Sequence, residues 1–172
     1  SDFTKLDPAL GTEDEFKALI SAAHDKGIKI MVDVVLNHAG YGQEEYFNIL
    51  LKDAEGNPIQ MIRDDSQQVS GSDQQASLSG LPDFLTENEA VRNQLVQWQV
   101  DWMKNYDIDY FRVDTVKHVD STTWSAFKNE LTKANPAFKM IGEYYGAGHS
   151  WNGGVLGSGQ MDSVLDFNFN DY

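Results

Sequence analysis

The sequence contains no cysteine, has few basic residues and includes no long apolar run. Without cysteine no disulfide can form, which fits a cytosolic protein or a bacterial secreted one. Thirteen basic residues against 27 acidic ones give a net charge of −14, which argues against nucleic acids and anionic membranes as partners. No apolar stretch approaches the roughly 20 residues that a membrane-spanning helix needs. We interpret the acidic excess as a solvated surface.

What the sequence does contain is enough apolar material for one ordinary domain. The chain has 172 residues, of which 41% are hydrophobic, and this length and composition can support a core. Its first residues, Ser1-Asp2-Phe3-Thr4, show no signal peptide and resemble the middle of a longer chain. We therefore expect an interior segment of a larger protein.

The first half of the chain combines two periodicities with a long interruption. Thr12 and Glu15 form a capping box, and the helix that follows is expected to end at Gly27. Residues 28–36 form a β-branched apolar run, which predicts a strand buried on both faces. Residues 39–80 are mostly polar, with few apolar positions, and predict a small inserted subdomain.

The alternation of helix and strand then resumes. Thr86 and Glu89 form a second capping box, which predicts the start of another helix, and a further helix is expected from about Asp120. Strands are expected at 109–114, 139–144 and 163–169. This order predicts a parallel α/β sheet with helices outside it.

The number of expected elements restricts the architecture. Four strands do not close a (β/α)8 barrel, which needs at least about 200 residues. A complete doubly wound domain is an alternative on length, but no glycine-rich phosphate loop follows any strand. We therefore predict a partial (β/α)8 barrel, with barrel segments at 1–38 and 81–172 around an insertion at 39–80.

Two carboxylates, Asp114 and Glu143, each end an apolar, strand-like run. Side chains at the carboxyl ends of neighbouring parallel strands meet at an active-site mouth, and paired carboxylates are the chemical groups of glycoside hydrolysis. Arg112 lies two residues before Asp114, so the two side chains share a strand face. Taken alone, such a pair is more often a buried ion pair, and an isolated glutamate after Gly142 is more often a loop residue.

Four motifs together carry a resemblance to a known family. They are Asp33-Val34-Val35-Leu36-Asn37-His38, Gly80-Leu81-Pro82-Asp83-Phe84, Phe111-Arg112-Val113-Asp114-Thr115-Val116-Lys117-His118 and Gly142-Glu143. In this order and spacing they resemble the signature regions of the α-amylase family, glycoside hydrolase family 13. The resemblance covers essentially the whole chain. It implies about strands 3–6 of the barrel, with the small subdomain after strand 3.

The resemblance also implies roles for individual residues. Asp114 matches the nucleophile of a retaining mechanism, and Glu143 matches the general acid/base. Asp33, His38, Arg112, Lys117 and His118 match substrate-binding positions, although Asp33 can equally brace the barrel. The Lys117-His118 pair favours α-1,4-linked glucans such as starch and maltodextrins.

A structural Ca²⁺ ion is a further implication of the resemblance. Asn37, Asp83 and the backbone carbonyl of His118 match family positions that often bind calcium between the inserted subdomain and the barrel. Because Ca²⁺ takes 6–8 oxygen ligands, others would have to come from the insertion. Asp64, Asp65 and Asp73 are candidates that the sequence does not rank.

Two other functions stay open at this point. One is an α-glucanotransferase of the same family, such as a cyclodextrin-forming enzyme. The other is a non-catalytic relative that acts as a binding module, which the presence of Asp114 and Glu143 disfavours. The family's third carboxylate is absent from the sequence, so the remainder of the barrel is required and the chain alone should be inactive. We expect secretion, with a cytoplasmic location as the alternative.

Overall fold

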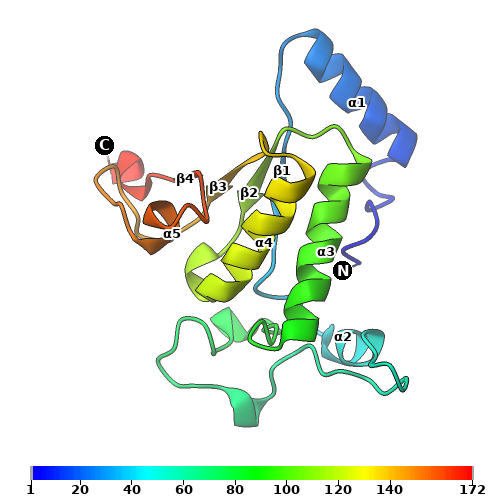
Figure 1. Cartoon of the computed structure of the whole chain (residues 1–172), viewed down its shortest axis with the longest axis vertical. Coiled ribbons are helices and arrows are strands. Elements are labelled where there is room, and N and C mark those ends of the chain that lie inside the picture. Colours follow the sequence, from blue (N-terminus) through cyan, green and yellow to red (C-terminus); the bar gives the residue numbers. More distant parts are fainter. Residues whose placement is uncertain (1, 172) are drawn as a thin grey trace.

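Four parallel strands form a single sheet in the order β1-β2-β3-β4 (Figure 1). The computed structural model describes residues 2–171, with only the backbone of Asn170 and Asp171. The strands are β1 (Met31–Val34), β2 (Tyr110–Val113), β3 (Lys139–Gly142) and β4 (Ser163–Val164). Strands that follow one another in the chain are therefore neighbours in the sheet, as the predicted α/β architecture requires.

Helices flank the sheet, and α3 and α4 lie against one of its faces (Figure 1). The α-helices are α1 (Glu13–Asp25), α2 (Glu44–Leu50), α3 (Glu89–Asn105), α4 (Ser121–Ala134) and α5 (Gly154–Gly157). Short 3-10 helices are η1 (Asp65–Gln67), η2 (Leu78–Gly80), η3 (Val116–His118) and η4 (Phe167–Asp171). Among residues 2–171, no helix combines the length and apolarity needed to cross a bilayer.

The helix starts test the capping predictions directly. The capping box of α1 is present, because Thr12 accepts from the Glu15 backbone and the Glu15 side chain accepts from Thr12. The second predicted box is wrong: Asn88, not Thr86, caps α3, by accepting from the Ala90 backbone at 3.0 Å. Thr86 is instead buried two residues before the cap, where its carbonyl accepts the hydroxyl hydrogen of Thr123.

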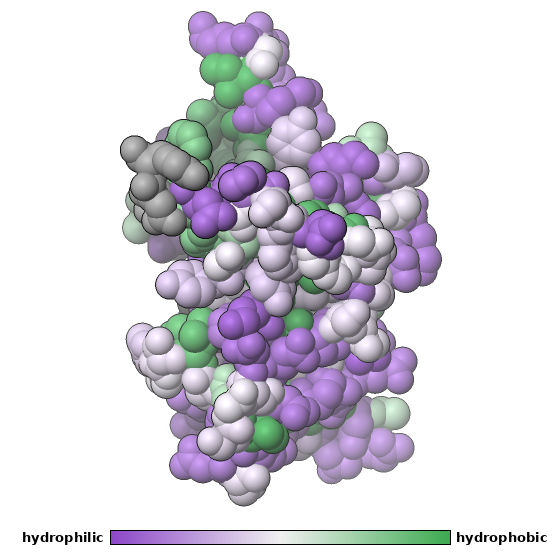
Figure 2. Space-filling model, turned by 90° about the vertical axis from the view of Figure 1, so that its left-hand side faces the viewer, coloured by the Kyte–Doolittle hydropathy of each residue, from purple (hydrophilic) through white to green (hydrophobic). Residues whose placement is uncertain are grey.

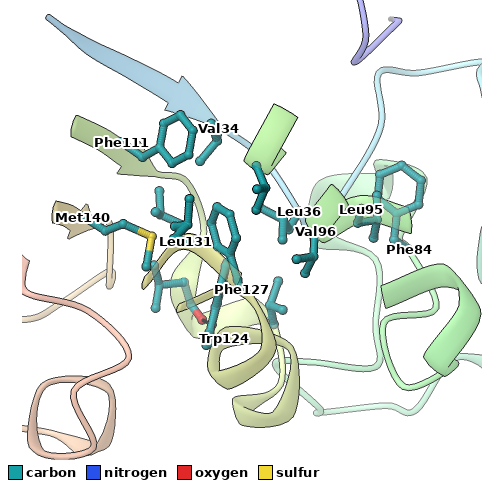
Figure 3. Packing of buried hydrophobic residues seen from close by; sticks show 14 of the residues in the cluster. Val34, Leu36, Phe84, Leu95, Val96, Phe111, Trp124, Phe127, Leu131 and Met140 are labelled. Atoms are coloured by element: carbon teal, nitrogen blue, oxygen red, sulfur yellow. Dashed lines mark hydrogen bonds between the residues drawn. The ribbon is translucent and has the colours of Figure 1, made fainter. Parts of the chain in front are cut away.

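The core lies between the sheet and helices α3 and α4 (Figure 3). Every second residue of β2 is buried, so Phe111 and Val113 point toward the helices. The expected inward face of α4 is confirmed, because Trp124, Phe127 and Leu131 are fully buried against them. Alternation places Arg112 and Asp33 on the other face of the sheet, together with Tyr110 and Met31.

Two strand predictions need correction. The predicted strand at 28–36 is shorter and is not buried on both faces, since Ile28 and Met31 remain 54% and 49% exposed. Within the described residues β1 pairs only with β2, and Met31, on the far face, stays half exposed. The strand predicted at 163–169 ends at Val164. The Asp166 carboxylate accepts from the Asn168 backbone at 3.0 Å, a turn that leads into η4.

The segment 39–80 lies beyond the end of β1, at one end of the sheet (Figure 1). It contains helix α2, which the sequence did not predict, and its few apolar residues contribute more to the core than the polar composition suggested. Phe47, Met61 and Ile62 are buried and join Phe84 in the main core. Isolated bridges connect Ile62 with Phe84 and His38 with Asp83. The segment therefore packs against the strand ends, although the predicted boundaries of a separate subdomain remain a prediction.

The surface on the β4 side is mostly hydrophilic (Figure 2). Figure 2 shows this face covered largely by hydrophilic and neutral residues, with apolar residues interspersed among them.

Candidate active site

Asp114 and Glu143 lie directly after β2 and β3, at the same edge of the sheet. The register pairs Val34 with Val113 and Val113 with Gly142, so the three strands end at one level. The ladder continues one residue further, because Asp114 N–H donates to Val34 at 2.9 Å and Glu143 N–H donates to Val113 at 2.8 Å. Both carboxylates are therefore held at the carboxyl ends of adjacent parallel strands.

Arg112 connects three carboxylates on the face of the sheet opposite the core. Its Nη1 lies 2.6 Å from Asp114 Oδ1 and 2.9 Å from Asp33 Oδ2, and its Nη2 lies 3.0 Å from Glu143 Oε2. Burial lowers the pKa of Arg112, but hydrogen bonds to Asp114 and Asp33 outweigh this and raise it overall. The guanidinium is thus a fixed positive charge between the two candidate catalytic groups.

The Arg112 cluster, defined as Arg112 with Asp33, Asp114 and Glu143, is open to solvent. The side chains of Asp114 and Glu143 are 19% and 25% exposed, and that of Asp33 is 59% exposed. Partly exposed carboxylates beside a fixed cation can bind a polar substrate without first breaking a closed core. The arrangement can therefore support nucleophilic and acid/base chemistry.

The backbone of Thr115 contacts the Glu143 side chain. Thr115 was not predicted as a site residue. Its N–H donates to Glu143 Oε2 at 3.1 Å, and Val116 N–H donates to the Glu143 carbonyl at 2.9 Å. Thr115 adopts a left-handed conformation with φ of 49°, which is unfavourable for a β-branched residue. A sequence motif does not reveal such a conformation, so this contact could only be found in the structure.

His38 lies on the β1 side of the cluster, with Nε2 4.0 Å from Asp114 Oδ2. Burial lowers the pKa of His38, while the charge of Asp114 opposes the shift. The Asn37 amide nitrogen lies 3.2 Å from His38 Nδ1, and because it can only donate, Nδ1 accepts. In the neutral ring the hydrogen is then on Nε2, on the side of Asp114.

Lys117 and His118 contact the segment 39–80 instead of Arg112. Lys117 Nζ lies 3.2 Å from Asp73 Oδ2, and His118 Nδ1 lies 2.8 Å from the Asp73 carbonyl. Asp73 therefore fixes both of these predicted sugar-binding residues. The sequence offered Asp73 only as an unranked calcium ligand.

The residues expected to bind calcium lie beside an arginine. Asp83, which is almost completely buried, forms an ion pair with Arg63, whose Nε lies 2.7 Å from Asp83 Oδ2. Burial raises the pKa of Asp83 to about 6, although Arg63 opposes the shift. Asp64 caps η1 instead of facing this pair. Within residues 2–171, no group of three or more histidine, aspartate or glutamate side chains is placed to hold a metal ion.

Comparisons with known proteins agree with this geometry. The family model described as the catalytic domain of alpha amylase matches residues 1–68 and 72–172. The α-amylase of Streptomyces lividans is 31% identical over 99% of the chain. A solved Anoxybacillus α-amylase superposes with a TM-score of 0.77 at 30% identity over 99% of the chain. An acarbose complex of Geobacillus thermoleovorans α-amylase gives 0.75 at 27% identity, also over 99%.

The chain corresponds to only part of each of these proteins. It spans 25% of the Streptomyces protein and 37% and 38% of the two solved chains. The four-stranded sheet is therefore part of a larger barrel, as the sequence predicted. Relatives include proteins named as periplasmic and as intracellular amylases, so either location is compatible with the fold. The conserved architecture and the match along nearly its whole length establish that this chain belongs to the α-amylase family.

Proposed function

We propose that this chain supplies the nucleophile and the acid/base of a retaining glycosidase that acts on α-1,4-linked glucans. The observation that carries the proposal is the bridging of Asp114 and Glu143 by one guanidinium at adjacent strand ends. A retaining mechanism needs two carboxyl groups about 5–5.5 Å apart, one on each side of the scissile bond. Contact with a single arginine brings both carboxylates within reach of one sugar unit.

In the first step, Asp114 attacks the anomeric carbon as the glycosidic bond breaks. Glu143, in its protonated form, donates a proton to the leaving oxygen, so the departing sugar leaves as a neutral alcohol. The contact with Arg112, at 2.6 Å, holds the Asp114 carboxylate at the strand end, where it can attack the anomeric carbon. This step produces a covalent glycosyl ester on Asp114.

In the second step, water replaces Asp114 at the same carbon. Glu143 is now ionised and takes a proton from the water, which attacks and releases the sugar with its original configuration. Two displacements at one centre restore the anomeric configuration. The proton returns to Glu143, and Asp114 is regenerated as a carboxylate.

The other predicted residues are proposed to hold the glucan. His38 and Asp33 lie next to Asp114 and Arg112, where they can contact the sugar being cleaved. Lys117 and His118 are proposed to bind the sugar on the leaving-group side. The acarbose complex of a related α-amylase supports a glucan-like ligand for this family.

Activity is proposed for the complete enzyme, by which we mean this segment joined to the remaining strands of its barrel. Those strands would also supply the third carboxylate expected for the family. The test is product analysis of the complete enzyme on starch, maltodextrin and pullulan, with NMR detection of the first anomer released. We expect α-configured products from α-1,4 cleavage; β-configured initial products would refute a retaining mechanism, and predominantly cyclic or transferred products would indicate a glucanotransferase.

A further inference from the structure

Arg63 forms a second arginine–carboxylate cluster, which plays no part in the proposed chemistry. All three guanidinium nitrogens are engaged: Nε with Asp83 at 2.7 Å, and Nη1 and Nη2 with Glu87 at 2.7 and 2.8 Å. Nη1 also donates to the Gln67 carbonyl at 3.3 Å. The side chains of Arg63 and Asp83 are each only 2% exposed. We call Arg63, Asp83 and Glu87 the Arg63 cluster.

The Arg63 cluster joins the segment 39–80 to the strand that leads into the active site. Arg63 N–H donates to the Asp83 carbonyl at 2.8 Å, so backbone and side chain bind the same residue. On the other side of Asp83, Phe84 N–H donates to Asn37 and Ala39 N–H donates to Pro82, both at 2.9 Å. Arg63 is therefore linked through Asp83 to the backbone beside His38.

Two of the residues expected to bind a cation come together here. Asp83 pairs with His38 in an isolated bridge, and the N–H of Phe84, the residue after Asp83, donates to the Asn37 carbonyl at 2.9 Å. The side chains of Asn37 and Asp83 are both buried. What differs from a calcium site is that the positive charge is already present on a side chain of this chain.

We propose that the Arg63 guanidinium replaces a divalent cation at the junction between the segment 39–80 and the sheet, so this junction needs no bound metal. A guanidinium offers five N–H donors in a planar fork, which suits two carboxylates without a full shell of oxygen ligands. Ca²⁺ would need 6–8 oxygen ligands in the same space, and Oδ2 of Asp83 already accepts a hydrogen bond from Arg63. A bound ion would have to displace a buried, fully hydrogen-bonded arginine.

The test is thermal unfolding of the complete enzyme with EDTA and with millimolar calcium chloride. For the unmodified protein we expect the same Tm in both conditions. For Arg63→Ser we expect a Tm lower by roughly 10 °C in EDTA, because the buried Asp83 loses its partner. Since the substitution leaves the Asp83 and Glu87 carboxylates facing each other without Arg63, calcium should restore part of that loss in a saturable way.

Arg63→Lys is the matched control, because it keeps the positive charge but cannot bind both carboxylates through a fork. We expect an intermediate Tm that calcium does not change. If Arg63→Ser does not fold in EDTA, its yield of folded protein with and without calcium gives the same comparison. The proposal would be overturned by a fall of several degrees when EDTA is added to the unmodified protein. An equal Tm for Arg63→Ser with and without calcium would also overturn it.

Discussion

The molecule contains two arginine–carboxylate clusters that are chemically alike and differ in access to solvent. Arg112 contacts three carboxylates at the strand ends, where Asp114 and Glu143 remain about a fifth to a quarter exposed. Arg63 contacts two carboxylates at the junction of the segment 39–80, where Arg63 and Asp83 are 2% exposed. In both clusters a guanidinium neutralises acids that would otherwise repel one another.

The difference shows how burial decides what such a cluster can do. A substrate can reach the Arg112 cluster, and its carboxylates can exchange an arginine contact for a sugar contact during reaction. In the Arg63 cluster, Arg63 and Asp83 are buried while Glu87 is 43% exposed, so breaking the Arg63–Asp83 pair would leave a buried ion unpaired. We therefore assign chemistry to the first cluster and structural cohesion to the second.

The largest expected effect is loss of activity on removing the nucleophile. Asp114→Asn in the complete enzyme should lower kcat by at least roughly 10³-fold, because the amide cannot form the glycosyl ester. The Tm should change little, since Asp114 is partly exposed. Steady-state kinetics and thermal unfolding measure the two effects. As a control, Asp25→Asn should leave kcat unchanged, because Asp25 is solvent-exposed. A near-normal rate for Asp114→Asn would show that Asp114 is not the nucleophile.

Replacing each arginine by methionine tests the contrast between the clusters. Arg112→Met should lower kcat by roughly 10²- to 10³-fold, the range typical of removing one hydrogen-bond donor that stabilises a transition state. The unfolding free energy should change little. Arg63→Met should lower the unfolding free energy by about 3–5 kcal/mol, because it leaves Asp83 buried and unpaired.

Denaturant unfolding and kinetics at low temperature separate these outcomes. For Arg63→Met, kcat per folded molecule should stay close to that of the unmodified enzyme. If Arg63→Met lost activity while fully folded, or if Arg112→Met lost only stability, the division between the clusters would be incorrect.

Asp109, which belongs to neither arginine cluster, tests how much an ion pair contributes to the unfolding free energy. Burial alone would raise its pKa, but hydrogen bonds from the Ile30 backbone, His24 and Lys29 lower it to about 2. Because the folded pKa lies below the unfolded value of about 3.9, this stabilisation is complete above about pH 5 and is lost as pH falls through about 2. It amounts to at most about 3 kcal/mol.

Asp109→Asn should therefore reduce stability at pH 7, and only a small difference from the unmodified protein should remain near pH 2. Unfolding in urea at a series of pH values measures this convergence. Asp107→Asn is the matched control, since Asp107 is almost fully exposed and lies 3.5 Å from His24. It should have little effect at any pH; a constant deficit for Asp109→Asn down to pH 2 would contradict the assigned cause.

The smallest expected effect sets the scale for an ordinary hydrogen bond. Thr12→Ala removes the cap of α1, which should cost about 1 kcal/mol of unfolding free energy. Thr12→Ser retains the capping oxygen and should be nearly neutral. Chemical denaturation of the two variants measures the difference, and equal stability would mean that the cap is not formed in solution.

The sequence was sufficient where periodicity and motif order carried the information. It predicted the parallel sheet, the start of α1 and the buried face of α4, because these depend on local spacing. It also placed Arg112 on the same face as Asp114, which a spacing of two residues requires of any strand. The four-motif resemblance identified the family before any contact was known.

The remaining features depend on tertiary contacts that no local pattern encodes. The exposure of Met31 depends on which elements lie next to β1. Asn88 caps α3, while Thr86 is buried two residues earlier. The ion pair between Asp83 and Arg63 could not be predicted from the sequence. Arg63 is 20 residues away from Asp83 in the sequence, and no motif in the neighbouring sequence indicates that the two side chains form a contact.

Direct detection of the covalent intermediate is the measurement closest to the central proposal. The complete enzyme carrying Glu143→Gln would be mixed with an α-maltosyl fluoride, whose leaving group needs no acid. Glycosylation should then proceed while hydrolysis of the ester, which needs the base, is slowed. We expect mass spectrometry to find a glycosyl adduct on the peptide containing Asp114. An adduct on a different residue, or continued turnover without any adduct, would contradict the account.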